Sequence, residues 1–438
     1  MKIKSDDSVL NSIIKNSGII LTGNSTASAF NLASFAIMAN QLGPEYLGIF
    51  VLCQTYALVI NDLFNIQTWE SLIKFGASKL SDNSIKSVIL TNLALDFISA
   101  IFAATLAILL AIPTIELLGW GDSLPSTESI GTYLALYSIT ILFNLTTLTI
   151  GIPRLFRKFI SVSIIYSVTA ALKLAFIGIN TFYTDSLVSY LTIYISFEII
   201  TNIALIILSF KLIHKHCGKG WWRDKLSINK EQIRFIWWTN LRTIIRIPVQ
   251  RLDVIIIGSV MDMTTLGIYK VYKEFAGLIS RVGDPVNQAI FPEFAKLIGQ
   301  QDSQKSIDIT KKTMLLLTGV GTLAFLSLLF SAEFLIGQFF GEQYLTLSLA
   351  LYLMLAAYTI SFITVPINSL FIAAGFAKYS FFVLLFTNFI YLISAFSLGY
   401  LYGIYGLIIA YTIQLFLNKG FKIHLMKKHP HEWHSKVR

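Results

Sequence analysis

Long apolar runs separated by short polar segments follow one another along the whole sequence. A helix of about 20 apolar residues is long enough to cross a bilayer. No loop between the runs is long enough to form a separate folded domain. The pattern therefore predicts an all-helical membrane protein with twelve spans. They cover residues 16–40, 46–68, 86–112, 130–151, 159–181, 186–212, 235–259, 265–290, 309–330, 347–372, 379–399 and 403–425.

The composition agrees with this interpretation, because 55% of the 438 residues are hydrophobic and 13% are charged, against about 25% charged in soluble domains. A net charge of +10 would suggest nucleic acid as the partner of a soluble protein. Here topology explains it, and no nucleic-acid partner is expected. Cys53 and Cys217 lack metal-binding spacing, and the His-rich segments at 214–217 and 429–434 are interpreted as solvated. No metal or cofactor is expected.

The basic residues predict the orientation of the spans. One side of the membrane carries 27 of the 34 Lys and Arg residues, and the remaining seven lie inside predicted spans. All charged residues in the loops on the other side are acidic, for example Glu45 and Asp122. Basic loops stay in the cytoplasm, so both termini are predicted to be cytoplasmic. The first apolar run has span length and no small-residue cleavage site, which predicts a first membrane helix rather than a signal peptide.

A short internal repeat divides the chain. LGIF at 47–50 returns as LGIY at 266–269, 219 residues later and six spans on. Two halves with the same orientation are typical of parallel repeats related by an axis along the membrane normal. We therefore predict an N-terminal six-helix lobe at 1–212, a basic cytoplasmic linker at 213–234, a C-terminal six-helix lobe at 235–425 and a cytoplasmic tail at 426–438.

The first two spans of the second lobe are unusually charged. A charge that faces lipid at mid-bilayer costs roughly 2.5–3.5 kcal/mol, so these side chains should face a water-filled interior. If residues 270–284 form a helix, their charged side chains fall on one face of it. The charged residues are Arg242, Arg246, Arg251, Asp253, Lys270, Lys273, Glu274, Arg281 and Asp284.

This charge balance predicts an anionic substrate. Six bases outnumber three acids, and the planar fork of Arg suits phosphate oxygens. Arg251 falls on the opposite face of an ideal helix, and only a distortion at Pro248 could bring it round. The alternative is that these residues form structural ion pairs, such as Lys270 with Glu274. In the first lobe the repeat-related positions carry a single acid, Asp62.

Four further ionisable residues lie inside predicted first-lobe spans, where a functional role is the default interpretation. Lys173 is a candidate to assist substrate binding. Asp62, Asp96 and Glu198 are candidates for coupling transport to H⁺ or Na⁺. Buried hydrogen bonds between helices are the alternative for each.

The first span contains scattered polar residues and leads into LGPEYLGIF (42–50), the related LGIY stands at 266–269, and a basic loop divides the twelve spans. In these features the chain resembles the polysaccharide transporter family, the Wzx-type flippases. The resemblance covers the whole chain. Multidrug-exporting MATE proteins and the lipid II flippase MurJ belong to the same MOP superfamily. The resemblance implies two six-helix lobes in a V and alternating access. MurJ-like proteins have two more helices, for which this chain has no room.

The implied substrate is an undecaprenyl-diphosphate-linked oligosaccharide, an O-antigen or other surface polysaccharide unit, and the implied location is the bacterial inner membrane. Membrane lipids, a polysaccharide polymerase and other assembly proteins are the expected partners. A diphosphate headgroup fits the cationic interior predicted above. The residues expected to bind it are Arg242, Arg246, Arg251, Lys270, Lys273, Arg281 and Lys173.

Two other classes of function remain as alternatives. A multidrug antiporter of the same fold would bind organic cations and should have an acidic interior. A polysaccharide polymerase or ligase would usually carry its catalytic groups on a sizeable external loop. The external loops here are short and hold no Arg, Lys or His, so a transporter is predicted rather than an enzyme.

Overall fold

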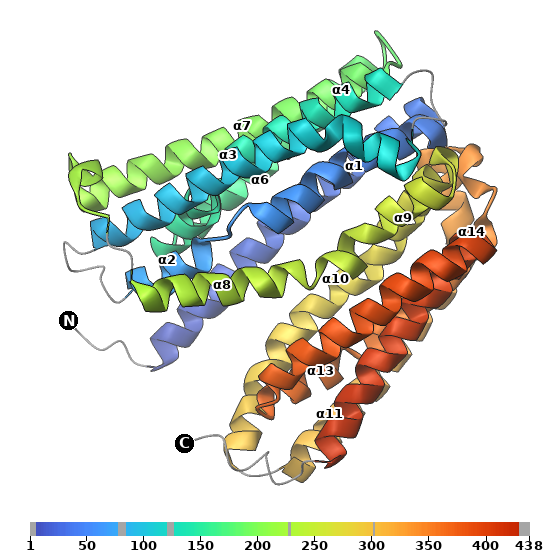
Figure 1. Cartoon of the computed structure of the whole chain (residues 1–438). Helices are drawn as coiled ribbons and strands as arrows, with labels where there is room; N and C mark the ends of the chain where they lie inside the picture. Colours follow the sequence, from blue (N-terminus) through green and yellow to red (C-terminus); the bar gives the residue numbers. More distant parts are fainter. Residues whose placement is uncertain (1–5, 78–84, 121–126, 227–228, 301–302, 429–438) are drawn as a thin grey trace. The chain divides into compact units, whose positions relative to one another are not determined.

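A computed structural model describes residues 6–77, 85–120, 127–226, 229–300 and 303–428, and every regular element within them is helical (Figure 1). The all-helical prediction is confirmed. The His-rich segment at 429–434 lies outside the described residues. In chain order the α-helices are α1 (Asp6–Phe64), α2 (Trp69–Gly76), α3 (Ile85–Leu118), α4 (Thr127–Ser138), α5 (Ile152–Leu155), α6 (Phe159–Asn180), α7 (Leu187–Cys217), α8 (Lys230–Ile244), α9 (Asp253–Val260), α10 (Met263–Gly299), α11 (Ser303–Phe340), α12 (Ser348–Ile363), α13 (Val365–Ala373) and α14 (Ala377–Lys428).

Short turns of tighter or wider helix lie between these α-helices. Three are 3₁₀ turns: η3 (Ile139–Phe143), η5 (Trp221–Arg223) and η7 (Glu342–Leu345). Two are π-helical: η4 (Thr147–Gly151) and η6 (Pro248–Leu252). π-Helical turns are rare and frequently lie at functional sites.

The chain divides into two compact units, and each is described here by itself. Unit 1 consists of residues 1–42 and 52–244, and unit 2 of residues 43–51 and 245–438. The helix α8 packs against α2 and belongs to unit 1, although its sequence lies in the predicted second lobe. The lobe boundaries predicted from the sequence stay a prediction.

Within the described residues, seven helices are long and apolar enough to cross a membrane, or eight if the bent pair Ile130–Phe143 and Thr147–Leu155 forms one span. Two of the seven contain a sharp break at a glycine with positive φ, Gly43 in α1 (φ 74°) and Gly403 in α14 (φ 59°). Glycine adopts such angles without steric cost. Each of these helices therefore contains two apolar segments.

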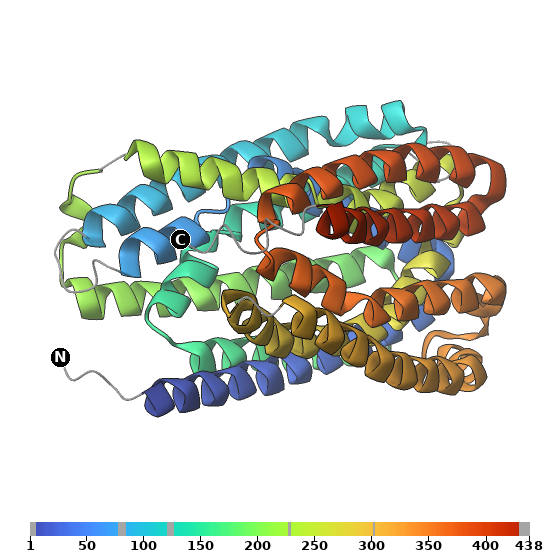
Figure 2. The same ribbon diagram turned by 90° about the horizontal axis from the view of Figure 1, so that it is seen from below.

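The break in α14 produces a tight helical hairpin. Figures 1 and 2 both show its two halves side by side, joined at one end. Beyond the turn, a Cβ on Gly406 would lie 1.9 Å from the carbonyl oxygen of Leu398, and one on Gly399 would lie 3.0 Å from the Leu407 side chain. Small residues of this kind let helix backbones approach closely in membranes.

A second close approach explains the internal repeat. In unit 2 a Cβ on Gly48 would lie 2.0 Å from the carbonyl oxygen of Met263, and a Cβ on Gly267 would lie 1.9 Å from that of Pro44. Gly48 and Gly267 are the glycines of the repeated motif, and Pro44 and Met263 are related by the same offset. The same contact is thus made twice, with the two repeats exchanging roles.

Replacing either glycine of this crossing by alanine should therefore destabilise the protein. The new methyl group has no space next to a backbone carbonyl, and overpacking of this kind costs roughly 1–3 kcal/mol. Gly48→Ala and Gly267→Ala should both lower the temperature of thermal unfolding, measured on purified protein in detergent. Gly319→Ala is the matched control, because nothing lies within 4 Å of its added Cβ. Wild-type unfolding temperatures for both crossing variants would contradict this packing.

Candidate functional site

The predicted charged face in unit 2 begins at a helix irregularity. The π-helical turn η6 starts at Pro248, which has no N–H to donate within the helix. A π turn changes the rotational register of the residues around it. The distortion that the sequence analysis required for Arg251 is therefore present, and Arg251 lies half-buried within it.

A buried carboxylate forms the centre of the unit 2 site. Asp253, the first residue of α9, is 1% exposed, and its Oδ2 accepts a hydrogen bond of 2.5 Å from the Tyr269 hydroxyl. The same oxygen pairs with Lys273 Nζ, which also donates to the Gln250 carbonyl oxygen at 3.2 Å. Asp253 Oδ1 has no hydrogen-bond partner among the described residues. The pairing holds α10 against η6 and α9 through one ammonium group.

A second, more exposed pair lies one residue away on α10. Lys270 Nζ is 2.9 Å from Glu274 Oε1, and their side chains are 19% and 28% exposed. This is the structural ion pair that the sequence analysis gave as the alternative to substrate binding. Lys270 and Lys273 are thus both held by carboxylates.

The structure places Arg242 in unit 1, where it joins α8 to α2. Its Nη2 donates to Glu70 Oε1 at 2.5 Å. Nearby, Lys74 lies 3.6 Å from Glu231 and 4.4 Å from the ring centroid of Phe235. The α8 surface is therefore joined to α2 through several charged contacts.

For the other cations predicted in this region, the structure gives fewer details. Arg246 belongs to unit 2 and is exposed. Arg281 lies in α10, and its side chain is outside the described residues. The structure therefore brings together Lys270, Lys273 and their carboxylate partners in one unit.

In unit 1 a chain of hydrogen bonds ends on Glu198. Gln54 Nε2 in α1 donates to the Tyr137 hydroxyl in α4, which donates to Glu198 Oε2 in α7, each bond being 3.0 Å long. Lys173 in α6 lies 4.4 Å from the ring centroid of Tyr194. The sequence analysis missed Tyr137 as the link. The offset of the repeat relates Gln54 to Lys273. Both side chains contact a tyrosine that is hydrogen-bonded to a carboxylate, or the carboxylate itself.

Asp96 has a structural role that its sequence does not show. It is fully buried in α3, and its two oxygens accept hydrogen bonds from Thr147 N at 2.6 Å and Thr146 Oγ1 at 3.2 Å. These residues lie where the helix is interrupted between η3 and η4. In hydrocarbon every freed backbone group needs an internal partner, and Asp96 supplies one. The alternative of a buried hydrogen bond is therefore observed at this position.

The same interruption is surrounded by amides that the sequence analysis did not single out. Asn65 Nδ2 donates to the Asn144 carbonyl oxygen at 3.0 Å, and Ser99 Oγ donates to Asn65 Oδ1 at 3.0 Å. Asn61 Nδ2 lies 3.4 Å from Oδ1 of Asp62, the half-buried third coupling candidate. Asparagines and threonines next to a break in an apolar run are the signal that could have predicted this network.

The sequence analysis did not single out two lysines near the end of α14. Lys422 is 5% exposed, and its Nζ donates to Asn368 Oδ1 at 2.7 Å. Lys419 Nζ donates to the Thr364 carbonyl oxygen at 3.2 Å, at the break between α12 and α13. Their spacing of three residues, which places both on one helix face, was the available signal.

Comparison with solved structures defines the class of fold. The lipid II flippase MurJ in an inward closed conformation matches with a TM-score of 0.71 at 14% identity, over 93% of this chain and 87% of that one. An inward-facing multidrug resistance MATE family transporter of the MOP superfamily matches with a TM-score of 0.69 at 13% identity, over 96% and 100%. The protein has the fold that MurJ and MATE transporters share.

Comparison of sequences finds a matching family model and one curated relative. Residues 154–349 match the model of a family described as polysaccharide biosynthesis protein. The inner membrane protein YghQ of Escherichia coli (strain K12) is 20% identical over 347 residues, which are 77% of this chain and 95% of that protein. These two matches agree with the resemblance to the polysaccharide transporter family that the sequence analysis describes.

The buried pair in unit 2 gives a test of its own energetics. Breaking a buried ion pair by removing one partner costs about 3–5 kcal/mol, whereas replacing both partners by uncharged groups is often neutral. Asp253→Asn or Lys273→Met alone should therefore lower the unfolding temperature more than the double variant does. Lys270→Met with Glu274→Gln is the control, and these more exposed changes should have little effect. If the single and double variants unfolded alike, the two groups would not be coupled.

Proposed function

We propose that this protein is a flippase that moves an undecaprenyl-diphosphate-linked oligosaccharide across the bacterial inner membrane by alternating access. The observation that carries the proposal is the match of residues 154–349 to polysaccharide biosynthesis proteins within a chain that has the MurJ fold. The inner-membrane relative supports the location. An O-antigen unit or another surface polysaccharide unit would be the cargo, and a polymerase would act on the product.

The proposed architecture has twelve crossings in two lobes. The breaks at Gly43 and Gly403 divide α1 and α14 into two crossings each. The segments α4 to α5, α8 to α9 and α12 to α13 are each taken as one interrupted crossing. Together with α3, α6, α7, α10 and α11 they give the predicted number. The side that carries the basic loops would be the cytoplasm.

In the proposed mechanism the cationic residues bind the diphosphate. An ammonium group has three N–H donors, so Lys273 and Lys270 can each bind a phosphate oxygen while a carboxylate orients them. Arg246, Arg251 and Arg281 would supply planar forks for bidentate contacts. Arg242, which pairs with Glu70, and Lys173 are further cationic residues proposed to bind the substrate.

A multidrug antiporter is the second candidate, because the MATE transporter shares the fold to almost the same extent. An organic cation would then be expected to bind to carboxylates. The buried Asp253 is already paired with Lys273, so the polar centre of unit 2 does not present an excess of negative charge. This balance favours the flippase. A polymerase or ligase is the third and weakest candidate.

Arginine substitutions test the binding role. Arg242→Ala, Arg246→Ala and Arg281→Ala should each abolish surface polysaccharide in a strain complemented with the variant, while its amount in the membrane stays unchanged. Lys311→Ala, an exposed residue of α11, is the control. Glu70→Gln separates two roles of Arg242, because a purely structural role predicts the same defect in both variants. Full activity in all three arginine variants would refute the binding assignment.

Glu198 is the strongest of the three coupling candidates. Both oxygens of Asp96 are engaged at the helix interruption, whereas Glu198 ends a chain of side-chain hydrogen bonds. Glu198→Gln keeps an oxygen that can accept from Tyr137 but cannot lose or gain a proton near neutral pH. In proteoliposomes, its transport of a labelled lipid-diphosphate sugar should no longer respond to an imposed H⁺ or Na⁺ gradient. Glu116→Gln, exposed at the end of α3, should respond like wild type. An unchanged response in Glu198→Gln would exclude this residue as the coupling site.

A further inference from the structure

Of the two lysines near the end of α14, Lys422 is buried and Lys419 is half-buried, and both donate to neutral acceptors. Lys422 donates to an amide oxygen of Asn368, and Lys419 to the backbone carbonyl of Thr364. Within the described part of the chain, neither forms an ion pair with a carboxylate. A buried charge is costly unless an opposite charge compensates it. Two such ammonium groups on one helix face therefore favour binding of an anion.

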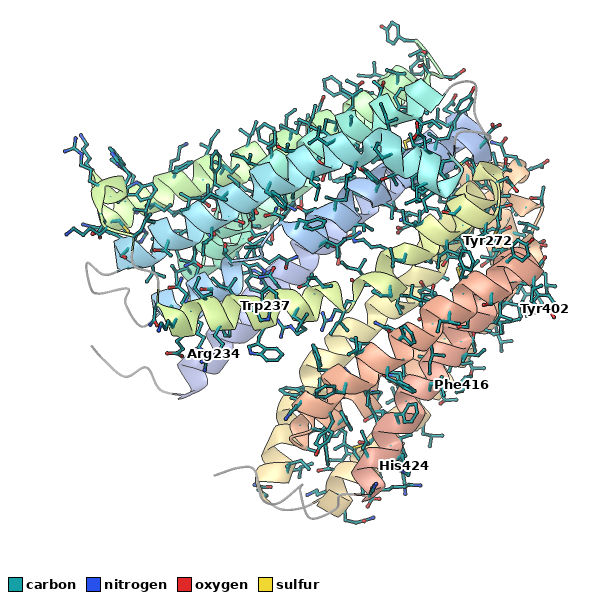
Figure 3. The ribbon with its side chains drawn as sticks, in the orientation of Figure 1. Arg234, Trp237, Tyr272, Tyr402, Phe416 and His424 are labelled. Carbon is teal, nitrogen blue, oxygen red and sulfur yellow. The ribbon has the colours of Figure 1, made fainter. Side chains whose placement is uncertain are left out.

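An apolar groove lies between α12 and α14, on the stretch of α14 that precedes these lysines. It encloses about 450 Å³ between α12 and α14, and its lining includes Leu353, Ala357, Ile360, Ile409, Ile413 and Phe416. Phe416 is 57% exposed, so the groove is open at the surface of unit 2. Figure 3 marks Phe416 and, further along α14, His424, and both lysines lie in the stretch between them.

The register of the two helices makes the groove and the lysines one continuous site. Thr364 follows Ile360 by four residues on one side, and Lys419 follows Phe416 by three residues on the other. The hydrogen bond between Lys419 and Thr364 therefore lies one helical turn beyond the end of the groove. A ligand of matching shape has a hydrocarbon chain at one end and an anionic group at the other.

We propose that this groove binds the isoprenoid lipid carrier, with the first part of its chain between α12 and α14 and its diphosphate at Lys419 and Lys422. This inference rests on the proposed function and names a binding site for its substrate outside the charged stripe on α9 and α10. The diphosphate diester carries about two negative charges and so balances both ammonium groups, whereas a phospholipid phosphodiester carries one. From Ile409 to Phe416 the groove runs roughly 10 Å along the helix, enough for the part of the chain nearest the headgroup.

The position of the site suits a first binding step. Asn368 and the Phe371 ring, 5.9 Å from Lys422 Nζ, belong to α13. The helix α13 packs against both α14 and α10, and α10 carries Lys270 and Lys273. The helices α13 and α10 meet near Phe294 and Ile298 of α10, so a headgroup held at Lys422 lies in the same unit as Lys273 but roughly 30 Å from it along α10.

Binding of undecaprenyl diphosphate to the purified full-length protein in detergent tests this inference. The variant Lys419→Met with Lys422→Met should raise the Kd by roughly tenfold or more, since charge-assisted hydrogen bonds to phosphate are lost. Lys427→Met with Lys428→Met removes the same charge from exposed positions on the same helix and should leave the Kd unchanged. Ala357→Phe, which fills the groove, should weaken binding without altering any charge.

Competing ligands identify the occupant. Undecaprenol, which has no charge, and inorganic diphosphate, which has no chain, should each compete poorly. Wild-type affinity in the Lys419/Lys422 double variant would overturn the proposal. Equal competition by phosphatidylglycerol would also overturn it, because the groove would then bind an ordinary lipid of the bilayer.

The controls separate this inference from misfolding and from the proposed function. Methionine replaces a buried lysine by an apolar side chain of similar length, so the double variant should unfold at the wild-type temperature or above. Binding at equilibrium requires no translocation. Lysine-dependent binding without transport by the wild-type protein would refute the flippase and leave the site intact. Transport with lysine-independent binding would refute the site alone.

Discussion

The absence of water from the bilayer core is the constraint on which the rest of this structure depends. Each interruption of a helix frees backbone groups that the protein itself must satisfy. Asp96 does so between η3 and η4, Lys419 does so between α12 and α13, and Asn388 donates to the carbonyl of Ile245 at 2.5 Å next to η6. Polar side chains therefore gather where helices break, and the same places supply the groups that can bind a charged ligand.

The same constraint determines how the cations are held. Arg242, Lys270 and Lys273 each contact a carboxylate, whereas Lys419 and Lys422 contact neutral oxygens. Paired cations are fixed in place before any ligand arrives, which reduces the entropy lost on binding. Cations with neutral partners keep an uncompensated positive charge, which favours binding of an anion. In the proposed flippase, the two kinds of site would contact the headgroup in succession.

Much of the fold could be predicted from the sequence because the bilayer imposes a length on every span. The apolar runs fall on the helices, and the gap between the predicted spans 235–259 and 265–290 contains the break between α9 and α10 at 261–262. The features that could not be predicted are contacts between residues far apart in the sequence. No periodicity shows that Glu70 would pair with Arg242 across 172 residues, or that Asp96 would meet Thr147. Lys419 and Lys422 lie near the end of the last predicted span, and only helix packing shows that Lys422 is buried and Lys419 half-buried.

The reciprocal contact between the repeats has a consequence for how such a chain can change over time. Most positions related by the offset of the repeat differ in the two halves, as Gln54 and Lys273 do in charge. The crossing of Gly48 and Gly267 is different, because either copy supplies the carbonyl on which the other's glycine rests. A bulkier residue in place of either glycine would clash with the backbone carbonyl of the other repeat. Mutual dependence of this kind preserves one symmetric contact between repeats that otherwise differ in sequence.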